Sequence, residues 1–174
     1  MKGLTNDYIA IDTNVFGHLT DTDGKNADGH INRLLTKLAQ KQITLLIDVG
    51  GKILAEYNGH LDPKKLKAKQ KLNEAQLIDY WMNHAPKKRV VVDENTPLWE
   101  EISRIIWEES EENDRIFVYV AFAKGRILVS NDRKHITNPN RRAELKTCYT
   151  CPPCVAGADV MPSCEACRLI SQAR

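Results

Sequence analysis

The chain has 174 residues and a mass of 19.7 kDa; 42% of its residues are hydrophobic and 28% are charged, with 25 Lys and Arg against 23 Asp and Glu. This balance is typical of a folded globular chain and excludes a disordered polar one. There is no apolar run of the ~18 residues that cross a bilayer, and the first residues lack the apolar stretch of a signal peptide. We therefore expect no membrane partner and a cytoplasmic location.

The net charge of +2 conceals three segments of alternating sign. Residues 61–89 hold eight bases and three acids, residues 93–114 hold nine acids and one base, and residues 124–146 hold seven bases and two acids. Basic segments beside an acidic one suit a polyanionic substrate, because bases hold phosphates and acids hold cations. The alternative interpretation is that these segments are solvated helix faces.

Four short apolar runs predict strands, at residues 8–11, 43–47, 90–92 and 127–129. Continuous apolar runs of this length are typical of strands that are buried on both faces.

Helical segments separate these runs. Apolar residues recur at the spacing of one helix face over residues 31–39, and a helix over residues 51–58 follows the second run. Thr96-Pro97 opens another helix as N-cap and first helical residue, and Asn113 caps the next, which ends at Gly125. Strands alternating with helices predict an α/β fold, a parallel sheet in three layers.

Carboxylates occupy the predicted edge of the sheet where the ligand sites of parallel sheets lie. Asp12 ends the first run, Asp132 follows the last, and Asp114 lies in the first turn of the helix before it. Glu56, in the helix after the second run, is the fourth acid. Two such charges 4 Å apart repel by ~4 kcal/mol at an effective dielectric of about 20, so a cation is needed to neutralise them.

Oxygen ligands without cysteine favour hard ions, which predicts Mg²⁺ or Mn²⁺ and metal-assisted hydrolysis of a phosphodiester. The alternative interpretation gives each acid a structural role. Asp12 would cap a helix that starts near Asn14, and Asp114 would be a first-turn acid favoured by the helix dipole.

In this order the residues resemble the PIN-domain nucleases. The resemblance rests on Asp12-Thr13-Asn14 after a short strand, Glu56 in a helix, Asp114 at a helix start and Ser130-Asn131-Asp132 after the last strand. The acids are 44, 58 and 18 residues apart, and the match covers residues 7–138. It implies a PIN-like fold and a metal-dependent endoribonuclease. The implied catalytic and metal-binding acids are Asp12, Glu56, Asp114 and Asp132, and the residues that orient them are Thr13, Asn14 and Ser130.

The substrate that the resemblance implies is RNA, and basic residues would hold its phosphates. The candidates are Lys64, Lys65, Lys67, Lys69, Arg133 and Lys134. Further partners to consider are a protein regulator or antitoxin and a second copy of the chain. The alternative function is a non-catalytic adaptor that binds nucleic acid or protein through the basic stretches and a cysteine-rich zinc knuckle, and needs no Mg²⁺.

All five cysteines lie in the last 27 residues, and their paired C-x2-C spacing is typical of zinc knuckles. The predicted Zn²⁺ ligands are Cys151, Cys154, Cys164 and Cys167, with Cys148 as an alternative ligand. An iron–sulfur site and unmetallated cysteines are the other interpretations.

Three prolines, Pro152, Pro153 and Pro162, argue against a helix in this part of the chain. We therefore divide the sequence into a PIN-like nuclease domain over residues 1–146 and a short, separable cysteine-rich tail over residues 147–174, held by structural zinc.

Overall fold

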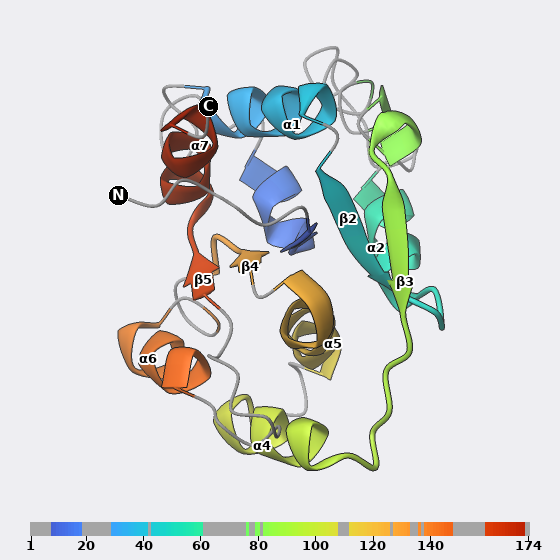
Figure 1. Cartoon of the computed structure of the whole chain (residues 1–174), viewed down its shortest axis with the longest axis vertical. Helices are drawn as coiled ribbons and strands as arrows, with labels where there is room; N and C mark the ends of the chain where they lie inside the picture. Colours follow the sequence, from blue (N-terminus) through green and yellow to red (C-terminus); the bar gives the residue numbers. More distant parts are fainter. Residues whose placement is uncertain are drawn as a thin grey trace.

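The computed structural model describes residues 8–18, 29–41, 43–60, 76, 79–80, 82–107, 112–125, 127–132, 136, 138–147 and 159–172. Its centre is a sheet of five parallel strands in the order β3-β2-β1-β4-β5, which is the predicted α/β class (Figure 1). Helices surround the sheet, an arrangement consistent with the predicted three layers.

The strands are β1 (Tyr8–Ile11), β2 (Thr44–Asp48), β3 (Lys87–Val90), β4 (Ile127–Val129) and β5 (Asp159–Met161). The α-helices are α1 (His30–Gln40), α2 (Lys52–His60), α4 (Pro97–Ile105), α5 (Glu112–Val120), α6 (Pro139–Thr147) and α7 (Ser163–Gln172). A 3-10 helix, η1 (Thr13–His18), follows β1, and a π-helix, η3 (Ala121–Gly125), continues α5.

The central strands form the core of the molecule. β1, β2 and β4 are buried almost throughout, as their uninterrupted apolar runs predict. α5 packs against β1 and β2, so its apolar residues Ile116–Val120 close the core on their side of the sheet. None of the helices in the described part of the chain is both long and apolar enough to span a membrane.

The third strand lies earlier than the sequence predicts. It covers Lys87–Val90 rather than residues 90–92, and Lys87 pairs with Leu45 of β2. β3 is an edge strand, so its charged side chains can remain in solvent while its backbone pairs. Val91, which the apolar run placed inside the strand, lies outside it and is 70% exposed.

The caps of two helices can be compared with the prediction. Thr96 caps α4, because its Oγ1 accepts a hydrogen bond from the Trp99 backbone N–H at 3.3 Å and Pro97 is the first helical residue. The prediction for α5 was wrong by two residues. The helix starts at Glu112, so Asn113 lies inside its first turn instead of capping it.

Two elements from the predicted cysteine-rich tail, in the part of it that the structure describes, join the rest of the fold. β5 pairs with β4, with Val160 opposite Leu128, and α7 packs against α1. Val160, Met161 and Cys167 are buried in the common core. Pro162 does not prevent a helix here, because it stands just before α7, where a missing N–H costs no helical hydrogen bond.

Candidate active site at the carboxyl edge of the sheet

Asp12 is held by hydrogen bonds to both its backbone and its carboxylate. Its backbone N–H donates to Val129 O at 2.9 Å, which continues the pairing of β1 with β4, and the side chain is only 2% exposed. Three donors hold its carboxylate. They are the Asn14 N–H (3.0 Å), Asn14 Nδ2 and Ser130 Oγ (2.8 Å). These contacts fix the orientation of the carboxylate.

Glu56 joins the site from α2. Thr13 Oγ1 donates to Glu56 Oε2 at 3.0 Å, which links the segment after β1 to this helix. The Asn113 side chain also forms a hydrogen bond with Glu56, so α5 is linked to the same carboxylate. Glu56 therefore stands between β1 and α5.

The segment after β4 supplies the third part of the site. The Asn131 backbone N–H donates to Asn14 Oδ1 at 2.7 Å, and the Asp132 N–H donates to Ser130 Oγ at 3.1 Å. The residues predicted to orient the acids, Thr13, Asn14 and Ser130, thus connect the ends of β1 and β4 with α2.

The electrostatics of the four acids show that they share one region. Burial, followed by the negative charges of Asp12, Asp132 and Glu56, raises the pKa of Asp114 to about 7. Burial also raises the pKa of Asp12 to about 6, although hydrogen bonds from Asn14 and Ser130 lower it in part. The Glu56 pKa is raised by burial as well. The quartet thus concentrates negative charge in a partly buried region, with Asp12 at its most buried point.

The structural alternative for Asp12 is also partly present. Its Oδ1 accepts the Asn14 backbone N–H at the start of η1, as a capping residue does, and its backbone O accepts the Val15 N–H at 3.1 Å. Capping alone leaves the bonds from Asn14 Nδ2 and Ser130 Oγ unexplained, since they come from side chains outside the helix backbone. Asp12 therefore caps η1 and belongs to the acidic site.

No three His, Cys, Asp or Glu side chains among the described residues lie close enough to hold one metal ion together. Mg²⁺ does not require such a group, because it keeps several waters and is usually bound through one or two carboxylates. The acid-rich, all-oxygen donor set matches a hard cation in kind.

Two residues near the site are missed by the sequence analysis. Asp48, at the end of β2, caps α2 by accepting the Lys52 and Ile53 N–H groups at 2.9 and 2.8 Å, and its charge contributes to the raised pKa of Glu56. Tyr57 lies beneath the site and donates its hydroxyl hydrogen to Ile11 O. The signal for Asp48 was available, because it is an acid directly after the predicted strand over residues 43–47, at the edge of the sheet where ligand sites lie.

A buried polar chain connects the site to α7. Asn131 Oδ1 accepts the Ser163 N–H at 3.0 Å and the Ser163 hydroxyl at 2.9 Å. Since that hydroxyl hydrogen is used, His30 Nε2, 2.8 Å from Ser163 Oγ, is the donor in their contact. The C-terminal helix thus holds the residue between Ser130 and Asp132.

Several predicted site residues lie outside the described residues: Lys64, Lys65, Lys67, Lys69, Arg133, Lys134, Cys148, Cys151 and Cys154. The other two predicted zinc ligands are described. Cys164 is half-buried, Cys167 is buried, and neither forms a disulfide.

Comparisons with known proteins add no relative. The sequence matches no protein-family model and no curated protein, and the fold matches no solved structure.

Proposed function

We propose that the chain is a PIN-like, metal-dependent endoribonuclease. The observation that carries the proposal is that four acids from four separate segments interact electrostatically: burial first, and then the charges of neighbouring acids of this set, raise the pKa values of Asp12 and Asp114. Acids that serve only as helix caps have no reason to gather in one desolvated region. The resemblance of the ordered motifs to PIN-domain nucleases supports RNA as the substrate.

The residues that would hold Mg²⁺ or Mn²⁺ are Asp12, Glu56, Asp114 and Asp132. When bound, such an ion supplies a water of lowered pKa and offsets charge on the scissile phosphate. Thr13 holds Glu56 through its hydroxyl, while Asn14 and Ser130 hold Asp12. These short side chains keep the acids oriented although their charges repel.

The proposal is tested by incubating the purified chain with end-labelled RNA and DNA, with Mn²⁺ or with EDTA, and sequencing the product ends. We expect internal cuts in RNA that require the metal. Asp114→Asn should lower the rate at least ~100-fold, because it removes one metal-binding charge.

Asp93→Asn is the matched control for this variant. Asp93 is exposed in the segment after β3, and its Oδ1 accepts the Asn95 N–H, a bond that asparagine can keep. Full activity in Asp114→Asn, or no cleavage in wild-type protein under any metal, would contradict the nuclease proposal. Metal-independent RNA binding without cleavage would instead favour the adaptor.

We also propose that the cysteine-rich region holds a structural Zn²⁺. Cys164 and Cys167 are three residues apart on α7, so their thiols share a helix face and can serve one ion. Elemental analysis should find about one zinc per chain, and Cys164→Ser with Cys167→Ser should remove it. Iron with labile sulfide would indicate a cluster instead, and a metal-free chain would contradict both.

A further inference from the structure

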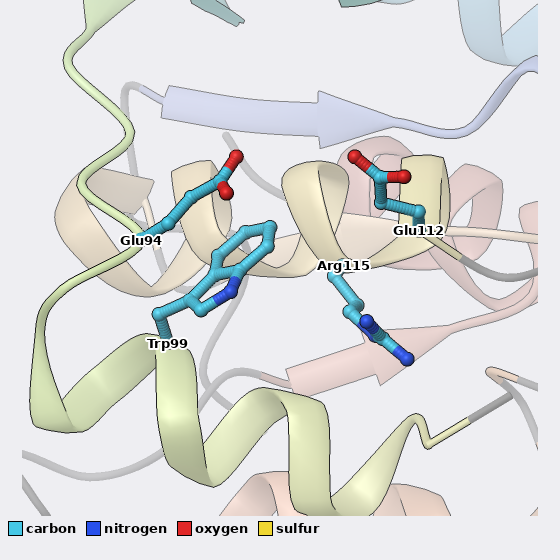
Figure 2. A pocket seen from close by; sticks show the side chains of 4 residues that line it. All are labelled: Glu94, Trp99, Glu112 and Arg115. Atoms are coloured by element: carbon cyan, nitrogen blue, oxygen red, sulfur yellow. The ribbon is translucent and has the colours of Figure 1, made fainter. Parts of the chain in front are cut away.

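A pocket of about 500 Å³ opens between the segment after β3 and the starts of α4 and α5. Glu94, Trp99, Glu112 and Arg115 line it, with Glu94 and Trp99 on one side and Glu112 and Arg115 on the other (Figure 2). The parallel sheet places the end of β3 at the same edge as the ends of β1 and β4. A pocket of this size can accommodate a nucleoside.

Lys52 connects the pocket to the acidic site. Its Nζ lies 3.2 Å from Glu112 Oε1 at the pocket, and it stands four residues before Glu56 on α2, hence on the same helix face. Glu112 itself is two residues before Asp114 on α5. A ligand in the pocket would therefore lie next to the Lys52 ammonium group, with the acids of the candidate site beyond it.

The lining groups select the ligand by chemistry. Among the described residues, no hydrogen bond or ion pair reaches the Glu94 carboxylate, which is exposed and can only accept hydrogen bonds. Arg115 can only donate, and its Nε bond to Ile106 O at 2.6 Å holds the guanidinium in place. The Trp99 indole is buried against Tyr119, with ring centroids 5.9 Å apart, and only 9% of the residue is exposed, so it contributes a small apolar surface to the pocket. These groups suit a planar ligand with both donors and acceptors.

Guanine fits this set better than the other bases. Its N1–H and N2–H are adjacent donors that one carboxylate can accept together, and its O6 and N7 are the acceptors that arginine prefers. Adenine and cytosine each offer a single exocyclic donor beside an acceptor that a carboxylate would repel. Uracil has one donor between two acceptors. A cationic peptide would pair with Glu94 but would be repelled by Arg115.

We propose that this pocket binds an unstacked guanine of single-stranded RNA next to the bond that is cut, an inference that rests on the proposed function. Glu94 accepts from N1–H and N2–H, Arg115 donates to O6 and N7, and the small exposed part of Trp99 contacts the base. Lys52 holds the phosphate that leads from the base toward the acids.

The test is calorimetric titration of the full chain with the 5′-monophosphates of guanosine, adenosine, cytidine and uridine, in EDTA so that no cleavage occurs. Guanosine monophosphate should bind about tenfold more tightly than the others, the discrimination typical of one bidentate base contact. Glu94→Gln should reduce this preference to about twofold or less. Glu100→Gln, an exposed acid of α4 outside the pocket, should leave it unchanged.

Equal affinity for all four nucleotides would mean that only the phosphate is recognised and would overturn the proposal. Binding of an arginine-containing peptide without nucleotide binding would do the same. The proposed function is tested separately, by RNA cleavage in the presence of Mn²⁺. Guanine selectivity without cleavage refutes the nuclease alone, whereas cleavage without guanine selectivity refutes the pocket alone.

Discussion

Asp12 and Asp114 carry the same charge but are held in different ways. Asp12 accepts hydrogen bonds from three donors, so its carboxylate also organises the ends of β1 and β4. Asp114 accepts none among the described residues, and the positive charge of Arg141 offsets its raised pKa only in part. The two residues should therefore respond differently to the same substitution.

Asp114→Asn should raise the free energy of unfolding in EDTA at pH 8 by about 1 to 3 kcal/mol, because it removes a buried charge and no hydrogen bond. Asp12→Asn should give no gain, since asparagine cannot accept from all three donors. Urea unfolding of the two variants beside the wild type measures both changes. Destabilisation by Asp114→Asn would mean that this carboxylate has a structural role.

The pH dependence of stability follows from the same pKa values. The folded-state pKa values of Asp12 and Asp114, about 6 and 7, exceed their ordinary value of 3.8, so the folded protein binds more protons between these limits. The stabilisation from protonating them is complete below about pH 4 and is lost as the pH rises through 6 to 7.

In EDTA, the urea concentration at the unfolding midpoint should therefore decrease as the pH rises from 5 to 8. The decrease should be smaller in Asp114→Asn than in the wild type. Mn²⁺ should offset the decrease, because the metal binds the deprotonated carboxylates. A midpoint that increases over this pH range in both proteins would show that other titrating groups determine the pH dependence of stability.

At the scale of elements, α7 reaches the acidic site through Ser163. Ser163→Ala removes one of the two donors to Asn131 Oδ1 and the acceptor of His30, at a cost of about 1 to 3 kcal/mol of stability. We expect kcat for RNA to fall about tenfold with little change in KM, because Asn131 loses its fixed position between Ser130 and Asp132.

The control for Ser163→Ala is Ser103→Ala. Ser103 Oγ is buried without a hydrogen-bond partner in the described part of the chain, so its removal should be neutral or slightly stabilising. Equal effects of the two substitutions on kcat would exclude a positioning role for Ser163. Recovery of kcat in Ser163→Thr, which keeps the hydroxyl, would support that role.

β5 and α7 also bear on how the chain can be divided. A chain ending at Thr147 would lose the strand beside β4 and the helix on α1, and would expose the core that Val160 and Met161 cover. We expect it to show no cooperative thermal transition by circular dichroism. A sharp transition in this truncated chain would support the predicted domain boundary after residue 146.

Over the whole molecule, the sequence best predicts those strands whose positions depend on burial alone. β1 and β4 match their apolar runs because nearly every residue in them faces the core. β3 and β5 depend on backbone pairing with a neighbour, and the charged residues Lys87–Arg89 and Asp159 conceal them. Local composition does not record such pairing.

The candidate site likewise has one part that the sequence predicts and one that it does not. That Asp12 and Asp132 meet follows from the parallel topology, which the alternation of strands and helices already predicts. The contact between Thr13 and Glu56 depends on the angle of α2, which is set by the Asp48 cap and by Gly51, whose φ of 80° suits glycine. These tertiary details require the coordinates.

The charged residues of the edge strand β3 also affect whether a second chain can add a strand to the sheet. Lys87, Lys88 and Arg89 are exposed on β3, and the outer backbone of this strand has no partner among the described strands. A second chain that added its own β3 there would bring two rows of cations together, and this repulsion opposes edge-to-edge aggregation. The three residues that make β3 hard to recognise in the sequence thus also help to keep the folded protein from forming extended sheets. Their effect should be largest at low ionic strength, where charges are least screened.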